Sequence, residues 1–76
     1  MSVHTEHYDG HEMSLIAHKV AAIESTLTTD ESYGRNLLED PELPERLGRV
    51  VVQQMHRRNY LVYAEGDGAV SISKKM

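Results

Sequence analysis

The sequence predicts an α+β fold in which three helices are followed by a C-terminal β-hairpin. In two stretches, residues 9–27 and 44–58, apolar residues recur three or four positions apart, which is the period of an amphipathic helix. After Asn59 the period changes to two, which is the period of a half-buried strand. We therefore expect a single small domain over residues 9–76. Residues 1–8 lack apolar periodicity and are expected to form a flexible N-terminal arm.

The first helix is predicted to begin near Asp9. Asp9 and Glu12 have the spacing of a capping box, in which each side chain accepts a hydrogen bond from the backbone N–H of the other residue. The apolar residues that follow recur at steps of three and four, which places them on one face of a helix of about four turns. They are Met13, Ile16, Val20, Ile23 and Leu27. This face should pack against the core.

A second, shorter helix is predicted between Thr28 and Pro41. Thr28 and Glu31 repeat the spacing of a capping box. The helix must end before Pro41, because the residue that precedes a proline is driven out of the α region. Its apolar residues are Tyr33, Leu37 and Leu38.

The third helix is predicted from Pro44, since proline suits the first helical position, to about Arg58. On a projection of about 100° per residue its apolar side chains share one side. They are Leu43, Leu47, Val50, Val51 and Met55. A polar group lies roughly 130° away on the same projection. It consists of Arg46, Arg49, Gln53, His56 and Arg57. Asn59 tolerates the left-handed conformation that ends helices and is the expected stop.

The predicted hairpin consists of Tyr60–Ala64 and Ala69–Ser73, two runs in which side chains alternate between two faces. Between them, Glu65–Gly68 contains two glycines, which supply the positive φ angles of a tight turn. A lone hairpin is barely stable in water, so one of its faces should lie on the helices.

Charge divides the chain by position. Up to Glu45 the formal charge is −8, and from Arg46 onward it is +4, within a total of −4. Each half can therefore attract a partner of the opposite charge. A domain of 76 residues without cysteine has a small core and no disulfide, which favours a homodimer. We expect a cytoplasmic protein, because no apolar run could span a membrane and the first residues lack the pattern of a secretory signal.

The sequence contains no arrangement of residues typical of a catalytic site. His18 and His56 lie in predicted helices and have no nucleophile at a fixed spacing. Gly66 and Gly68 lack the preceding strand and following helix of a phosphate-binding loop. We therefore predict a protein that is not an enzyme and has no cofactor.

Three histidines lie close together near the start of the chain, at His4, His7 and His11. Imidazole is a common metal ligand, so this group could share an ion. Its spacing matches no established site, and no cysteine accompanies it. We interpret the histidines as part of a polar arm and predict no metal.

The stretch Leu47–Ser73 resembles the recognition helix and wing of winged helix-turn-helix regulators, a class of small bacterial and phage proteins. The helix end His56–Asn59 is followed by Tyr60–Tyr63, a turn with glycines, and Val70–Ser73. This resemblance implies a small DNA-binding transcriptional regulator whose third helix enters the major groove. It implies contacts to bases or phosphates from Arg46, Arg49, Gln53 and Arg57. It also implies contacts to phosphates from Lys74 and Lys75.

Two features oppose binding to DNA. Glu65 and Asp67 at the wing tip would repel phosphates, and the acidic first half weakens the attraction on which nonspecific affinity depends. The arginines could instead form the solvated face of an ordinary amphipathic helix.

The alternative hypothesis is an inhibitor or adaptor of the kind encoded by small phage and plasmid genes. It would dock through its acidic N-terminal half on a basic protein surface, with a few apolar anchors inside a polar rim. The predicted carboxylates are Glu31, Glu39, Asp40, Glu42 and Glu45. The predicted anchors are Tyr33 and Leu38.

Overall fold

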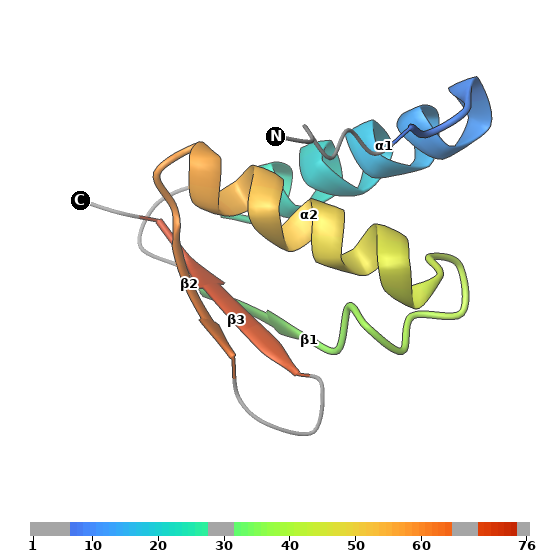
Figure 1. Cartoon of the computed structure of the whole chain (residues 1–76). Coiled ribbons are helices and arrows are strands. Elements are labelled where there is room, and N and C mark those ends of the chain that lie inside the picture. The colour runs from blue at the N-terminus through green and yellow to red at the C-terminus, as the bar shows by residue number, and fades with distance from the viewer. Residues whose placement is uncertain (1–6, 28–31, 65–68, 75–76) are drawn as a thin grey trace, which may run out of the picture.

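The computed structural model describes residues 7–27, 32–64 and 69–74. Within these ranges the chain has two helices and three strands, in the order α1 (Gly10–Thr26), β1 (Ser32–Arg35), α2 (Glu45–Arg57), β2 (Leu61–Ala64) and β3 (Val70–Ser73). The strands form one antiparallel sheet in the order β1-β3-β2. Both helices lie on the same side of this sheet, so the domain has two layers (Figure 1).

The chain is α+β, but the predicted arrangement of three helices followed by a hairpin is wrong. The described part of the predicted second helix contains β1, which is followed by turns up to Leu43. Gly34 would sit inside that helix and disfavour it, whereas Tyr33 suits a strand. β1 pairs with β3 along its whole length, and the central strand of the sheet thereby gains a second partner. The predicted capping box of Thr28 and Glu31 lies outside the described residues.

α1 begins as predicted. Glu12 N donates to Asp9 Oδ1 at 2.8 Å, Asp9 N donates to Glu12 Oε1 at 3.2 Å, and the capping box is complete. Ile16 and the later members of the predicted apolar stripe are buried. Met13 is 56% exposed, so its predicted place in the core is wrong and the buried face starts one turn later.

α2 corresponds to the predicted third helix. Pro44 precedes it as the N-cap instead of occupying its first position. Asn59 has a φ of 67°, which confirms the predicted stop in the left-handed region. The buried face of α2 includes Gly48 as well as large apolar residues, so the helix backbone closely approaches the turns that follow β1.

β2 and β3 form the predicted hairpin, with Leu61 opposite Ser73 and Ala64 opposite Val70. The turn that joins them lies outside the described residues. Ile72 on the central strand is fully buried beneath the helices. The core between the two layers consists of Ile16, Val20, Ile23, Leu27, Leu37, Leu43, Leu47, Val51, Met55, Val70 and Ile72. None of the helices in the described ranges is both long enough and apolar enough to cross a membrane.

Candidate nucleic-acid interface

One side of α2 faces away from the core and is mostly basic. We call it the α2 outer face, and its exposed residues are Arg46, Arg49, Gln53, His56 and Arg57. Steps of three and four along a helix place side chains on one surface, which explains why these residues lie together. Glu45 is the only carboxylate within α2. Four of the predicted DNA contacts are thus on one exposed surface.

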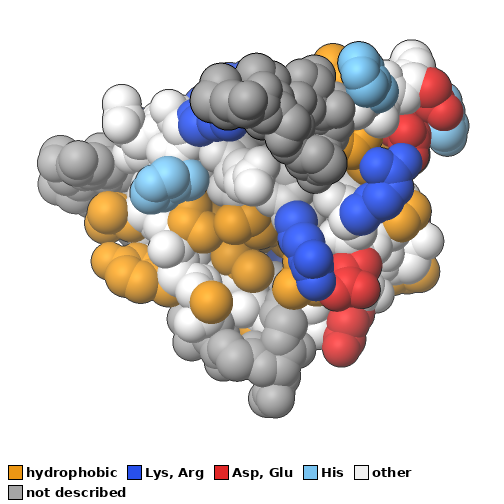
Figure 2. Space-filling model, in the orientation of Figure 1, with side chains coloured by type: hydrophobic (Ala, Val, Ile, Leu, Met, Phe, Trp, Pro, Cys, Tyr) orange, Lys and Arg blue, Asp and Glu red, His pale blue; other side chains and the backbone are white. Residues whose placement is uncertain are grey.

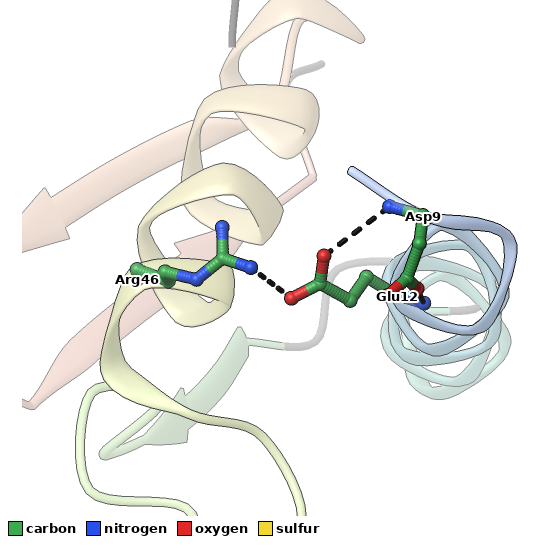
Figure 3. Close-up of polar contacts among 3 residues, drawn as sticks. All are labelled: Asp9, Glu12 and Arg46. Carbon is green, nitrogen blue, oxygen red and sulfur yellow. Dashed lines mark hydrogen bonds and ion pairs between the residues drawn. The ribbon is translucent and has the colours of Figure 1, made fainter. Parts of the chain in front are cut away.

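Arg46 is held by residues from the start of the chain. Its guanidinium donates to Glu12 Oε2, while the other oxygen of the same carboxylate completes the cap of α1 (Figure 3). The guanidinium also lies 5.2 Å from the centre of the Tyr8 ring, within the range of a cation–π contact. Tyr8 belongs to the predicted arm but packs against the core; residues 1–6 lie outside the described ranges.

Arg49 and Arg57 differ in their surroundings. Arg49 donates to Glu45 at 2.8 Å, one helical turn away, and both side chains are more than half exposed. Such surface pairs contribute about 0 to 1 kcal/mol to stability, so another anion can replace the carboxylate. Within the described part of the chain, Arg57 forms no ion pair.

Lys74 is exposed and directly follows β3. Because Ser73 pairs with Leu61, which starts β2, Lys74 lies at the end of the sheet where α2 also ends. Lys75, and the predicted wing-tip acids Glu65 and Asp67, lie outside the described residues.

Arg58 was not among the predicted contacts, and it serves the fold. It donates to Glu24 Oε1 at 3.3 Å, and the Tyr60 hydroxyl donates to Glu24 Oε2 at 3.0 Å. Burial and the hydrogen bond to Glu24 raise the pKa of the Tyr60 hydroxyl. This cluster fastens the end of α2 to α1.

Asp40, predicted to dock on a partner, lies inside the molecule. Its side chain is fully buried, with Oδ2 at 2.7 Å from Lys19 Nζ and 3.6 Å from a terminal nitrogen of Arg35. Asp40 Oδ1 accepts a hydrogen bond of 2.9 Å from the backbone N–H of Glu42. The hydrogen bond from Lys19, followed by that from Glu42 N, lowers the pKa of the Asp40 carboxyl. Asp40 therefore joins α1, β1 and the loop before α2.

The other predicted residues of the acidic surface have mixed surroundings. Glu39 and Glu42 are exposed, and Glu39 accepts a 2.6 Å hydrogen bond from Asn36. Tyr33 and Leu38 are half-buried, with Tyr33 packed against the core. Exposed negative charge thus remains in this loop, but the two predicted anchors are partly covered by the chain itself.

A hollow of about 500 Å³ lies between α2 and the hairpin. Its lining is mostly apolar and consists of Val52, Gln53, His56, Arg57, Val62, Ala64 and Val70. Figure 2 shows hydrophobic side chains gathered in the middle of this side of the molecule. Sequence reasoning missed the hollow. The available signal was Val52, an apolar residue that borders the polar side of its helix.

Within the described ranges, no three histidine or carboxylate side chains come close enough to hold a metal ion. Of the three N-terminal histidines, His4 lies outside these ranges. Comparison of the chain with protein-family models, with curated proteins and with solved structures gave no match.

Proposed function

We propose that this protein binds duplex DNA through the α2 outer face. The observation that carries the proposal is the exposure of three arginines and a glutamine on one side of a helix that buries its other side. Arginine forms two parallel hydrogen bonds with guanine or phosphate, and glutamine does so with adenine. An α-helix fits the width of the major groove.

The ion pairs of Arg46 and Arg49 are compatible with this role. Both arginines are more than half exposed; Glu45 is also more than half exposed, whereas the Glu12 side chain is 22% exposed. A phosphate that replaces the Glu45 carboxylate restores the charge pair of Arg49, and the net cost is the small free energy of an exposed surface pair. These carboxylates also repel DNA, so we expect weak binding with a strong dependence on salt.

The test is the affinity for a fluorescein-labelled duplex, measured by anisotropy across a series of salt concentrations. Wild type should bind at low salt, with log K falling as log salt rises by about 0.9 per phosphate neutralised. Arg49→Gln should weaken binding and reduce that slope by about one.

Arg58→Gln is the matched control, because it removes the same charge from a residue that pairs with Glu24 outside the α2 outer face. It should leave the slope unchanged. Absence of binding at low salt, or equal effects of the two substitutions, would falsify the proposal.

We do not extend the proposal to the acidic surface. The buried ion pair of Asp40 with Lys19 removes the central carboxylate of that surface from any partner. Glu39 and Glu42 remain exposed, but Leu38 beside them is half-buried.

A further inference from the structure

The hollow between α2 and the hairpin adjoins an unusual sheet edge. β2 bonds only to β3 among the described strands, so its other side is an edge of the sheet. Natural proteins commonly protect such edges with lysine, proline or a bulge, because the free N–H and C=O groups can pair with another chain. β2 has the sequence Leu-Val-Tyr-Ala and contains no charge and no proline.

The side chains of β2 offer apolar contacts on both faces of the sheet. Val62 and Ala64 line the hollow on the inner face. Leu61 and Tyr63 point to the outer face and are 40% and 54% exposed. A strand added beside β2 would therefore place one set of side chains at the hollow and the other set beside Leu61 and Tyr63.

The polar part of the hollow carries a positive charge, from Arg57. Arg57 and His56 belong to its lining, and among the described residues no carboxylate does. Within the described ranges Arg57 has no anionic partner. An occupant that carries a carboxylate would form a charge-assisted hydrogen bond with Arg57, which is stronger than a bond between neutral groups.

From the open edge, the apolar hollow and the unpaired cation together, we infer that this protein binds an extended acidic peptide segment of a partner protein. The segment adds a strand to β2, places alternate apolar side chains in the hollow and directs a carboxylate to Arg57. This is a different surface from the acidic loop around Asp40. It does not depend on DNA binding, although Arg57 belongs to both surfaces.

The probe is the fluorescent peptide acetyl-Glu-Thr-Leu-Thr-Val-Thr-Glu-amide, in which the glutamates and the apolar residues share one face of an extended strand and the threonines lie on the other. Wild type should bind it saturably. Arg57→Gln should lower the affinity about tenfold, and Arg58→Gln, the neighbouring charge-matched control, should change it less than about twofold. A peptide with glutamine in place of both glutamates should bind about tenfold more weakly than the acidic peptide.

Two further variants test the apolar contact. Val52→Asp puts a carboxylate into the hollow and should abolish binding of the acidic peptide. Ala64→Glu, at an exposed position of β2, provides the same test if Val52→Asp does not fold. Circular dichroism establishes the folded state of each variant.

Backbone methylation tests strand addition. Two versions of the peptide carry N-methyl groups on alternate residues, one on the even and one on the odd positions. Only N–H groups on one side of an added strand face β2, so one version should bind and the other should not. Equal behaviour of the two versions overturns strand addition.

Three other results overturn the inference. The first is that wild type does not bind the peptide saturably, and the second is that Arg57→Gln and Arg58→Gln lose the same affinity for it. The third is that wild type sediments as a dimer and that the peptide dissociates this dimer. The last result would place a second copy of this chain in the hollow.

Discussion

Glu12 and Arg46 connect the cap of α1 to the α2 outer face. One carboxylate oxygen of Glu12 accepts the backbone N–H of Asp9, and the other accepts the guanidinium of Arg46 (Figure 3). A residue predicted to cap a helix thus also neutralises a residue predicted to contact DNA. The proposed interface is therefore partly inhibited by the chain's own charge.

Replacement of Glu12 should release Arg46 for DNA. Glutamine can still accept the N–H of Asp9, so we expect Glu12→Gln to change the free energy of unfolding by less than about 1 kcal/mol. The affinity for duplex DNA at low salt should rise about threefold, because a DNA phosphate no longer competes with the Glu12 carboxylate for Arg46. Anisotropy titrations of wild type and variant measure this change.

Glu39→Gln is the control for net charge. It removes one negative charge from an exposed side chain that pairs with Asn36 and does not contact Arg46. An equal rise in affinity for both variants would show that net charge, and not release of Arg46, is responsible.

The features that the sequence predicts well depend on neighbours along the chain. The capping box of Asp9 and Glu12 spans three positions, and the left-handed stop at Asn59 depends on one residue. The outward position of the α2 arginines follows from the helical period alone. Such local relationships can be recognised without the fold.

The features that were missed depend on contacts between distant residues. β1 forms because Tyr33 lies opposite Ile72, and no periodicity in a four-residue strand identifies that pairing. Arg46 lies 34 positions from Glu12, so its ion pair could not be predicted from spacing. The hollow is lined by Val52 of α2 and Val62 of β2, and the sequence does not show that these two elements lie side by side.

The buried carboxylate of Asp40 should make a large contribution to stability. Asp40→Asn removes its charge from Lys19 and Arg35, and we expect the free energy of unfolding to fall by about 2 to 3 kcal/mol at pH 7. Urea denaturation followed by circular dichroism measures the difference. Glu42→Gln, at an exposed neighbouring carboxyl, should change it by less than about 0.5 kcal/mol.

The contribution of Asp40 should also depend on pH. Its pKa is lowered from the ordinary value of 3.8, so the folded state binds its proton less readily than the unfolded state. The stability from this group is therefore complete above the unfolded pKa and is lost as the pH falls through the folded pKa. The difference between wild type and Asp40→Asn should decrease as denaturation is repeated below about pH 4. A difference that stays constant down to pH 2 would contradict this account.

The Tyr60 hydroxyl should contribute to stability through Glu24. Tyr60→Phe removes a 3.0 Å hydrogen bond to a carboxylate and should lower the free energy of unfolding by about 1 kcal/mol at pH 7. The pKa of Tyr60 is raised above 10.0, so the folded state retains this proton better than the unfolded state. Its contribution is complete below about pH 10 and is lost as the pH rises through the folded pKa.

Tyr63→Phe is the matched control, since Tyr63 is 54% exposed on the outer face of the sheet. It should leave stability nearly unchanged at pH 7. Thermal denaturation of both variants and wild type at pH 7 provides the comparison. Equal stabilities of Tyr60→Phe and wild type would show that the hydrogen bond from Tyr60 to Glu24 does not stabilise the contact between α1 and α2.

Gly48 should be required for the close packing of α2. Helix propensity alone predicts that Gly48→Ala stabilises the protein by about 1 kcal/mol. A Cβ atom at this position, however, would overlap the carbonyl oxygen of Leu37, which is backbone and cannot move aside as a flexible side chain can. We therefore expect the free energy of unfolding to fall by about 2 kcal/mol. Urea denaturation of wild type and Gly48→Ala shows whether the substitution lowers or raises the free energy of unfolding.

Gly10→Ala separates packing from propensity. Gly10 is also helical, at the start of α1, and a Cβ atom there would meet no atom within 4 Å. This substitution should be neutral or stabilising by up to about 1 kcal/mol, because alanine loses less conformational entropy than glycine on folding. If both substitutions stabilised the protein, the turns after β1 could not lie against α2 as they do here, and the path of the chain from β1 to α2 would have to change.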